Sequence, residues 1–351
     1  MEAIRSYLIL YNNSILNALK QLDAVSDNGM LTLFVIDESN HVIGSLTDGD
    51  CRRALIKGAG LTDSVATVMR NDFTYIDDDN YSSGLISFIR QKDIKLVPYL
   101  YKDKTVKKIL DFSNGKSYLP IDAVLMAGGK GERLRPLTLN IPKPLLKVGG
   151  KAIIDYNIDN LFHYGIDTIN VTVHYLAEQI ESHFKDEKNG VKINCIHEGD
   201  TFLGTIGGIQ QIKEWHNDTI LLMNSDLFTN INLEAFYQHF LQNEADISVA
   251  AFPYTVNIPY GIFELEGVRD ITGIKEKPSY YYYANAGIYL FKKELVGLIP
   301  RNTFYDATDF LTDLIAKHYK VIRFPISGYW IDIGKPADFQ KVQELAEHLK
   351  K

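Results

Sequence analysis

The feature that most constrains this chain is a glycine-rich loop that directly follows a short apolar strand. Residues 122–127 read DAVLMA, a run of strand length, and the chain continues with Gly128, Gly129 and, after one further residue, Gly131. Glycines allow the backbone to approach a ligand closely and to direct its N–H groups at an anion. The pattern therefore predicts a phosphate-binding loop at the carboxyl end of a strand.

The same loop carries three cations, at positions 130, 133 and 135, which a tight turn without a ligand does not require. A dinucleotide-binding G-x-G-x-x-G motif is excluded, because its third glycine would fall at Leu134. A further cation follows in Pro142-Lys143-Pro144, where prolines on both sides predict an extended, stiff backbone. A lysine held in this way can act as a point charge aimed at a phosphate.

From residue 121 onward, segments of strand and helix character alternate. The predicted strands are 122–127, 168–173, 191–196, 220–226 and 246–252, and the predicted helices are 152–165, 176–184, 233–243 and 336–351. This alternation predicts an α/β domain over residues 121–351, with a Rossmann-like, mixed and mostly parallel sheet that has helices on both faces. Ligands of such sheets bind outside the carboxyl ends of the strands.

Residues 1–118 have a different pattern and predict a separate small α+β domain, joined by a polar linker at 111–120. The predicted elements of a first module, 1–65, are a helix over 13–23, strands at 34–37 and 42–46, and a helix that begins at Asp48 or Asp50. The predicted elements of a second, degenerate module, 66–118, are a helix over 81–91, a strand over 94–101 and a short helix over 106–112.

Composition excludes several classes of protein. The 37 basic and 44 acidic side chains leave a net charge of −7, which disfavours a nucleic-acid-binding surface of clustered cations. No apolar run approaches the ~20 residues that span a bilayer. The two cysteines, Cys51 and Cys195, are too few and too far apart for a disulfide framework. We therefore expect a cytoplasmic protein that binds neither nucleic acid nor membrane.

Seven motifs in order resemble those of the sugar-1-phosphate nucleotidyltransferases, the NTP transferase family. They are AGGKGERLRPLT (127–138), PKPLL (142–146), LGTIGG (203–208), NSD (224–226), EKP (276–278), NAGIY (285–289) and WIDIG (330–334). The resemblance covers residues 121–351 and implies the nucleotide-diphospho-sugar transferase type of fold. It also implies a reaction that joins a nucleoside triphosphate to a sugar 1-phosphate, giving a nucleotide sugar and pyrophosphate.

The resemblance implies a role for each matching residue. The catalytic residues are Arg133, Lys143, Asp226, Lys277 and Asp332. The nucleotide-binding residues are Ala127, Gly128, Gly129, Gly131, Arg133, Glu198, Gly204, Thr205 and Asp226. The sugar-phosphate-binding residues are Lys143, Glu276, Lys277, Asn285 and Gly287. Two of these carboxylates, Asp226 and Asp332, are expected to hold Mg²⁺, which takes one or two carboxylates and completes its shell with phosphate and water.

Glu198 occupies the region where relatives place the residue that reads the edge of the base. A carboxylate there can accept hydrogen bonds from guanine, whereas glutamine is usual among readers of thymine or uracil. The preferred substrate is therefore GTP, with UTP, dTTP and CTP as alternatives. Gly199 or Asp200 could take this position instead, because the alignment of the loop is uncertain by one or two residues.

Residues 1–118 resemble a pair of CBS modules, which commonly bind adenine nucleotides. The first module carries G-x-x-T-x-x-D at residues 44–50, which implies a ribose site at Thr47 and Asp50. The alternative is a dimerisation module without a ligand. A CBS pair ahead of this catalytic domain is similar to the arrangement in bacterial guanylyltransferases that make GDP-glucosamine for legionaminic acid synthesis, but mannose- or heptose-type guanylyltransferases stay open.

Two hypotheses about the function of this chain place it in different classes of protein. The first is an enzyme, a homodimer or higher homo-oligomer that the N-terminal pair assembles or regulates. The second is a non-catalytic nucleotide sensor that keeps the fold. Degraded catalytic residues would favour the sensor, and all five predicted catalytic residues are present.

Overall fold

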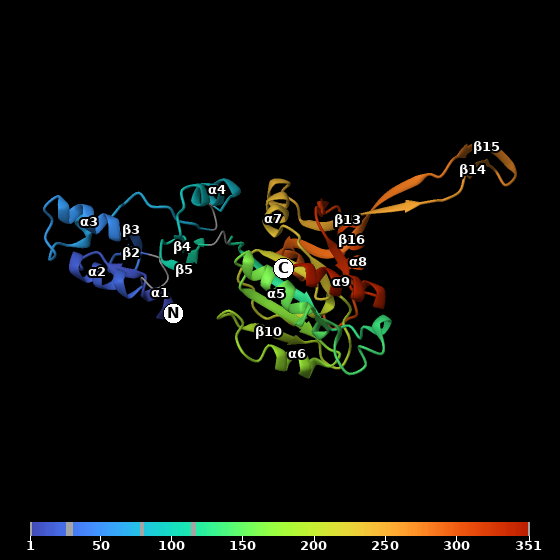
Figure 1. Ribbon diagram of the computed structural model, residues 1–351, viewed down its shortest axis with the longest axis horizontal. Coiled ribbons are helices and arrows are strands. Elements are labelled where there is room, and N and C mark those ends of the chain that lie inside the picture. Colours follow the sequence, from blue (N-terminus) through green and yellow to red (C-terminus); the bar gives the residue numbers. More distant parts are fainter. Residues whose placement is uncertain (1, 26–30, 78–80, 114–116, 350–351) are drawn as a thin grey trace. The chain divides into compact units, whose positions relative to one another are not determined.

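The computed structural model describes residues 2–25, 31–77, 81–113 and 117–349. The chain forms two compact units, Met1–Tyr118 and Leu119–Lys351 (Figure 1). Residues 114–116 of the predicted linker lie outside the described residues. Each unit is considered by itself.

The first unit begins with a three-stranded sheet and its helices. Its elements are α1 (Glu2–Arg5), β1 (Leu8–Leu10), α2 (Ile15–Ala24), β2 (Thr32–Ile36), β3 (Val42–Thr47), α3 (Asp48–Ile56), the 3₁₀ helix η2 (Val65–Thr67), α4 (Ser83–Gln91), β4 (Leu96–Leu100) and β5 (Val106–Asp111). In the sheet β1-β2-β3, β1 is parallel to β2 and β3 is antiparallel to it. Helix α2 begins at Ile15, within the predicted range 13–23, because the side chain of the N-cap residue Ser14 accepts a hydrogen bond from the N–H of Asn17.

The predicted short helix over 106–112 is wrong. These residues form β5, which pairs antiparallel with β4, so that Leu110 faces Val97 and is buried. A six-residue helix is marginal in water, whereas a partner strand satisfies the backbone of β5 and buries its apolar side chains. The second module therefore ends in a β-hairpin and does not repeat the helix of the first.

The second unit is an α/β domain. Its strands are β6 (Ile121–Met126), β7 (Lys147–Val148), β8 (Lys151–Ala152), β9 (Thr168–Val173), β10 (Ile193–His197), β11 (Thr219–Asn224), β12 (Leu227–Thr229), β13 (Ile247–Asn257), β14 (Ile262–Glu266), β15 (Asp270–Lys275), β16 (Ser279–Lys292), β17 (Val321–Pro325) and β18 (Trp330–Asp332). Its helices are α5 (Ile153–His163), α6 (Ala177–His183), α7 (Leu233–Gln242), α8 (Ala307–Ala316) and α9 (Pro336–Leu349), with 3₁₀ turns η4 (Glu132–Leu134), η5 (Lys143–Leu145), η6 (Gly207–Gln211) and η7 (Lys293–Leu298).

Seven strands form the main sheet, in the order β10-β9-β6-β11-β16-β13-β17. Four neighbours, β10, β9, β6 and β11, run parallel, and β16 runs antiparallel to both of its neighbours. The predicted mixed and mostly parallel sheet is therefore confirmed. Parallel order brings the carboxyl ends of β6, β9, β10 and β11 to one edge, where the glycine-rich loop begins.

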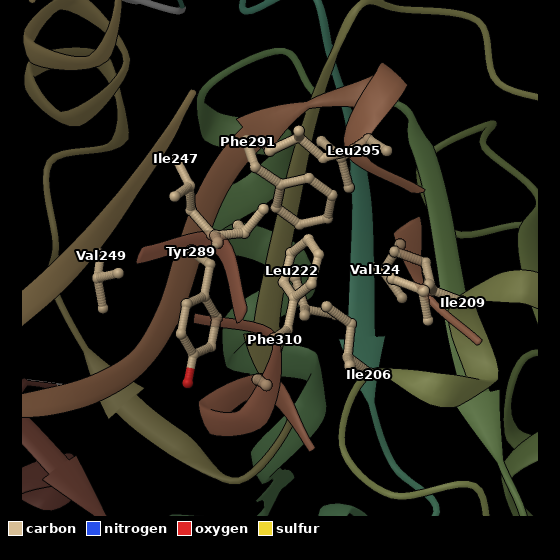
Figure 2. Packing of buried hydrophobic residues seen from close by; sticks show 14 of the residues in the cluster. Val124, Ile206, Ile209, Leu222, Ile247, Val249, Tyr289, Phe291, Leu295 and Phe310 are labelled. Carbon is tan, nitrogen blue, oxygen red and sulfur yellow. The ribbon is translucent and has the colours of Figure 1, made fainter. Parts of the chain in front are cut away.

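Both faces of the central strands are buried. On one face, Val124 and Leu222 pack with Phe291 and with Phe310 of α8 in an apolar cluster of this unit (Figure 2). The alternate residues Leu125 and Leu221 point to the opposite face and are also fully buried. Burial on both faces holds this edge of the sheet rigidly, which is what a site built on strand ends requires.

Strands β13 and β16 pair far beyond the sheet, and their outer parts are exposed. They lead into the hairpin β14–β15, which projects from the body of the second unit (Figure 1). We call residues 262–275, which comprise β14, β15 and the turn between them, the ribbon.

Candidate active site

A cavity of about 400 Å³ lies at the carboxyl ends of β6, β9 and β11. All nine residues predicted to bind nucleotide line it, and so does Lys143. The nine are Ala127, Gly128, Gly129, Gly131, Arg133, Glu198, Gly204, Thr205 and Asp226. The structure thus brings together residues that are spread over 100 positions of the sequence, while their roles remain predictions.

The glycine-rich loop is in close contact with the opposite wall of the cavity. A Cβ atom at Gly128 would lie 2.7 Å from Glu198 Oε1 and 3.2 Å from the Phe202 ring. Contacts this short are not tolerated, so only glycine allows the loop to pass Glu198. A Cβ at Gly129 would meet no atom within 4 Å, so this residue borders open space in the cavity.

The predicted extended backbone at Lys143 is wrong. Lys143 begins the 3₁₀ turn η5, and Pro142 before it is extended. Proline fixes φ near the helical value, so Pro144 fits the second position of a short turn as well as it fits a strand. The turn buries the Lys143 side chain, which points to the acidic residues at the rear of the cavity.

Strand pairing brings the two predicted metal ligands together. Strand β12 pairs antiparallel with β18, and Leu227 faces Asp332 in the register. Asp226 precedes Leu227 directly, two residues after β11 ends, so both carboxylates lie at the same end of this two-stranded sheet. Lys143 Nζ forms an ion pair with Asp226 Oδ2 and lies 3.6 Å from Asp332 Oδ1.

The surroundings of Asp332 in this cluster disfavour its charged form. Burial raises the pKa of Asp332, and the nearby charge of Asp226 raises it further. Lys143 and Arg133, whose Nη2 lies 4.0 Å from Asp332 Oδ2, oppose this effect without cancelling it. An additional cation would therefore stabilise the ionised pair.

One observation bears on Mg²⁺. The Oδ1 atom of Asp226 is buried and has no hydrogen-bond partner among the residues that the structure describes. A buried carboxylate oxygen without a partner is costly unless a ligand completes it. The described residues hold no group of three or more acidic, histidine or cysteine side chains that would form an all-protein metal cage. Two carboxylates nevertheless fit Mg²⁺, since phosphate oxygens and water supply its other ligands.

Glu198 follows β10 directly and is almost completely buried. Burial raises its pKa, and the hydrogen bond that its Oε2 accepts from the N–H of Leu203, at 3.0 Å, works in the opposite direction. Its other oxygen, Oε1, lies beside Gly128 and Gly208. The bond to Leu203 fixes the side chain against the cavity wall, so Oε1 is held in a defined position.

Thr205 is held by Asp306, a residue that the sequence analysis missed. Asp306 Oδ1 accepts hydrogen bonds from the N–H and the hydroxyl of Thr205, at 2.9 and 3.1 Å. The Thr205 hydroxyl in turn accepts from the N–H of Ala307, at the start of α8. Asp306 stands 101 positions from Thr205, and its only sequence signal is an acidic residue ahead of a helix.

Phe202 and Thr172 were also missed, although both line the cavity. The Phe202 ring lies 6.0 Å from the His174 ring and 6.0 Å from the Phe304 ring. Thr172 is a buried hydroxyl-bearing residue in the apolar strand β9. A lone aromatic residue in a loop and one threonine in a strand are too common to indicate a site from sequence.

The predicted sugar-phosphate residues are only partly brought to the cavity. Gly287 packs against Asn224, a residue that lines the cavity. A Cβ atom added at Gly287 would lie 2.5 Å from Asn224 Nδ2. The Asn285 amide donates to the Tyr289 hydroxyl at 2.9 Å and accepts from the N–H of Gly287 at 2.9 Å, so it shapes this strand locally.

Glu276 and Lys277 are exposed and are not among the residues that line the described cavity. They form the turn between the ribbon and β16, and Lys277 has a positive φ of 43°. Lys277 is therefore not part of the lining of this cavity, and its catalytic role stays a prediction.

In the first unit, Thr47 and Asp50 form the capping box of α3. The Asp50 N–H donates to Thr47 Oγ1 at 3.2 Å, and Asp50 Oδ2 accepts from the Thr47 hydroxyl at 2.6 Å. Thr47 is therefore the N-cap, and α3 begins at Asp48, one of the two predicted starts. A cavity of about 620 Å³ between the two modules of this unit is lined by Thr47, Arg70, Lys92 and Lys95 among others, but not by Asp50.

Comparison with known proteins identifies the family. A profile described as Nucleotidyl transferase matches residues 122–348. The chain therefore belongs to the nucleotidyl transferase family.

Across the part of the chain that the structure describes, no helix combines the length and the apolar character needed to cross a membrane.

Curated relatives cover the second unit. Mannose-1-phosphate guanyltransferase of Yarrowia lipolytica is 32% identical over 225 residues, 62% of this chain and 61% of its own length. UTP–glucose-1-phosphate uridylyltransferase of Synechocystis is 30% identical over 238 residues, again 62% of this chain and 61% of its own. Bifunctional protein GlmU of Methanocaldococcus jannaschii is 33% identical over 225 residues, 62% and 52%. The chain thus spans between half and about 60% of the length of these relatives.

Among solved structures, that of HddC from Yersinia pseudotuberculosis is similar with a TM-score of 0.50 and 27% identity. It covers 64% of this chain and 98% of its own. This similarity supports the fold of the second unit.

Proposed function

We propose that this protein is a Mg²⁺-dependent sugar-1-phosphate nucleotidyltransferase that converts GTP and a sugar 1-phosphate to a GDP-sugar and pyrophosphate. The observation that carries the proposal is the cavity, in which the glycine-rich loop, Arg133 and Lys143 face the carboxylate of Asp226. Family membership supports the reaction class, because two of the relatives named above are a guanyltransferase and a uridylyltransferase of sugar 1-phosphates.

In the proposed reaction, an oxygen of the sugar phosphate forms a bond to the α-phosphorus of the nucleotide. The bond from the α-phosphorus to the bridging oxygen breaks, and pyrophosphate leaves with the electron pair. The second pKa of a phosphate is about 6, so the nucleophile is already an anion at neutral pH and needs no general base. Catalysis then depends on alignment of two polyanions and neutralisation of the charge between them.

The side chains around the cavity can perform these tasks. The backbone N–H groups of the glycine-rich loop bind phosphate oxygens, and Arg133 neutralises charge that develops on the leaving group. Lys143, which forms an ion pair with Asp226, bridges the reacting phosphates. Asp226 and Asp332 would hold Mg²⁺, which would supply positive charge next to the α-phosphate.

GTP is proposed because the fixed Oε1 of Glu198 can accept from the N1–H and N2–H₂ donors of guanine. The relatives named above differ in the base that their names state, so the proposal rests on this carboxylate. For the sugar, we propose an amino sugar 1-phosphate such as glucosamine 1-phosphate, as in legionaminic acid synthesis. Use of soluble nucleotides, together with two free cysteines, fits a cytoplasmic enzyme.

Pyrophosphate release from the full chain tests this proposal. The assay combines GTP, UTP, CTP or dTTP with the 1-phosphates of glucosamine, mannose, glucose and a heptose, with Mg²⁺ and with EDTA. We expect turnover with GTP and loss of turnover with EDTA. A rate at least tenfold higher with UTP, CTP or dTTP would contradict the choice of base, and nucleotide binding without turnover on any sugar would favour the sensor.

We also propose that the first unit binds an adenine nucleotide in its cavity of about 620 Å³. Three cationic side chains, Arg70, Lys92 and Lys95, border this cavity and could neutralise phosphates. Thr47 lines this cavity and Asp50 does not, so a ribose contact would come from Thr47. Calorimetric titration of the full chain with AMP and ATP tests binding, and Arg70→Ala should weaken it about tenfold.

A further inference from the structure

The segment between Arg133 and Lys143 contains no helix or strand in its central part. Residues 135–142 lie between η4 and η5, and we call them the connector. Three large apolar side chains of the connector are 44–50% exposed, namely Leu137, Leu139 and Ile141. Apolar packing alone therefore does not hold the connector in place, and its position depends on hydrogen bonds from neighbouring segments.

Tyr175, which the sequence analysis missed, supplies such a bond from the segment that follows β9. Its hydroxyl donates to the carbonyl oxygens of Thr138, at 3.1 Å, and Leu139, at 3.0 Å. The single O–H proton is therefore shared between two acceptors. The Gln179 amide, one turn further in α6, donates to the carbonyl oxygen of Asn140 at 2.9 Å. Two side chains thus hold three consecutive carbonyl groups of the connector.

The backbone fixes the position of Tyr175. Its N–H donates to the carbonyl oxygen of Gly128 at 3.4 Å. The next residue, Leu176, is the N-cap of α6 and has a positive φ of 51°. Leucine seldom adopts this conformation, so the surrounding structure must maintain it. Tyr175 therefore contacts the glycine-rich loop through its main chain and the connector through its side chain.

Thr138 links this contact to the cations of the cavity. Its side chain is buried, and its hydroxyl donates to the carbonyl oxygen of Gly131 at 2.8 Å. A Cβ at Gly131 would lie 3.0 Å from Thr138 Cγ2 and 3.1 Å from Lys143 Cβ, so Gly131 is enclosed between these two side chains. The carbonyl oxygen of Gly131 also accepts from the N–H of Leu134, at 3.0 Å, which closes the turn that carries Arg133.

We propose that Tyr175 is a positioning residue for nucleotidyl transfer. Its hydroxyl holds the connector, and with it Thr138, where Arg133 and Lys143 are directed at the phosphates. Charges of this kind lower the barrier only when they are held close to the productive geometry. The inference rests on the proposed function, which assigns these two cations to the phosphates. Tyr175 itself lies outside the lining of the described cavity, so it acts through them.

The first test is Tyr175→Phe, which removes the hydroxyl and keeps the ring. We expect kcat for pyrophosphate release to fall about 10-fold, with KM for GTP changed less than about threefold, because misplaced charges weaken the transition state more than the ground state. The matched control is Tyr156→Phe, which removes a hydroxyl that donates to the carbonyl oxygen of Val148 at 2.9 Å. This control should leave kcat unchanged. An unchanged kcat in Tyr175→Phe would overturn the proposal.

A second background distinguishes positioning from general support of the fold. In Arg133→Ala, the further change Tyr175→Phe should lower kcat by no more than about threefold, because one of the groups that Tyr175 positions is already absent. A reduction of the same size in both backgrounds would show that Tyr175 does not act through Arg133, and would overturn the proposal.

Amide hydrogen exchange of peptides that cover residues 128–143 gives a measurement without turnover. Tyr175→Phe should raise the exchange rate there at least about fivefold, whereas Tyr156→Phe should not. Unchanged exchange in Tyr175→Phe would overturn the proposal whether or not the chain is active. Absence of turnover by the natural chain would contradict the proposed function instead, and exchange would still decide whether Tyr175 holds the connector.

Discussion

Lys143 and Asp226 form an ion pair at the rear of the cavity, although 83 positions separate them in the sequence. The pair occupies only one of the two Asp226 oxygens, and the other is buried without a partner among the described residues. A lysine and a metal ion could therefore share this carboxylate. Removal of its charge should affect the metal and the phosphates together.

Asp226→Asn should lower turnover by at least about 100-fold, because preorganised charges around a transition state typically contribute several kcal/mol. The amide keeps the shape of the side chain, so the far-ultraviolet circular dichroism spectrum should not change. Pyrophosphate release with excess Mg²⁺ measures the effect. Asp159→Asn, which removes a surface ion pair with Lys151, is the matched control and should retain nearly full activity.

The raised pKa of Asp332 predicts a dependence of stability on pH. The folded protein binds a proton at Asp332 more tightly than the unfolded chain does, so its free energy of unfolding falls as pH rises from about 3.8 through the raised pKa. Above that window the full cost of the buried charge is present. Asp332→Asn should therefore unfold at a higher temperature than the natural chain at pH 7.5 without Mg²⁺.

The same variant should lose this advantage at low pH, where Asp332 of the natural chain is protonated. Mg²⁺ should raise the unfolding temperature of the natural chain more than that of Asp332→Asn, because the metal offsets the repulsion between the two carboxylates. Thermal unfolding at a pH below 3.8 and at pH 7.5, with and without Mg²⁺, gives both comparisons. If Asp332→Asn is less stable than the natural chain at pH 7.5 without Mg²⁺, the buried charge of Asp332 does not destabilise the folded chain, and this prediction is wrong.

The parts of the site that local sequence determines were predictable. The glycine-rich loop follows β6 directly, and its glycines, together with Arg133, line the cavity as the strand–loop pattern indicates. The alternation of strands and helices was sufficient to predict the α/β class. These features depend on residues within about ten positions of one another.

Features that depend on pairing between distant segments were not predictable from the residues alone. Asp332 reaches Asp226 because β18 pairs with β12 in one particular register, and only family resemblance suggested it. Asp306 supports the loop at Thr205 through a contact that no local pattern reveals. The helix predicted over 106–112 is wrong for the same reason, since pairing with the distant strand β4 makes this segment a strand.

Glu198→Gln tests the reading of the base. Glutamine can still accept the hydrogen bond from Leu203 N–H, so the fold and the position of the side chain should persist. It replaces one acceptor with a donor, which opposes the N–H donors of guanine. We expect kcat/KM for GTP to fall about 10- to 100-fold relative to that for UTP. An unchanged ratio of the two values would assign base selection to other residues, such as Gly199 or Asp200.

Gly204→Ala tests the support of the loop at the base of the cavity. Gly204 has a φ of 80°, and a Cβ there would lie 2.6 Å from the carbonyl oxygen of Tyr305. Both effects strain the folded state, so the free energy of unfolding should fall by about 1–3 kcal/mol. The displacement of the loop that relieves this strain should also raise KM for the nucleotide, because Gly204 and Thr205 both line the cavity.

The control for Gly204→Ala is Gly297→Ala, in the 3₁₀ turn η7. A Cβ at Gly297 meets nothing within 4 Å, and Gly297 is not among the glycines with a positive φ. Alanine there should leave stability unchanged or slightly raised, since it restricts the unfolded chain. Urea denaturation of both variants, together with KM for the nucleotide, separates the two positions. Equal stability of the two variants would show that the contact with Tyr305 relaxes freely and does not constrain the loop.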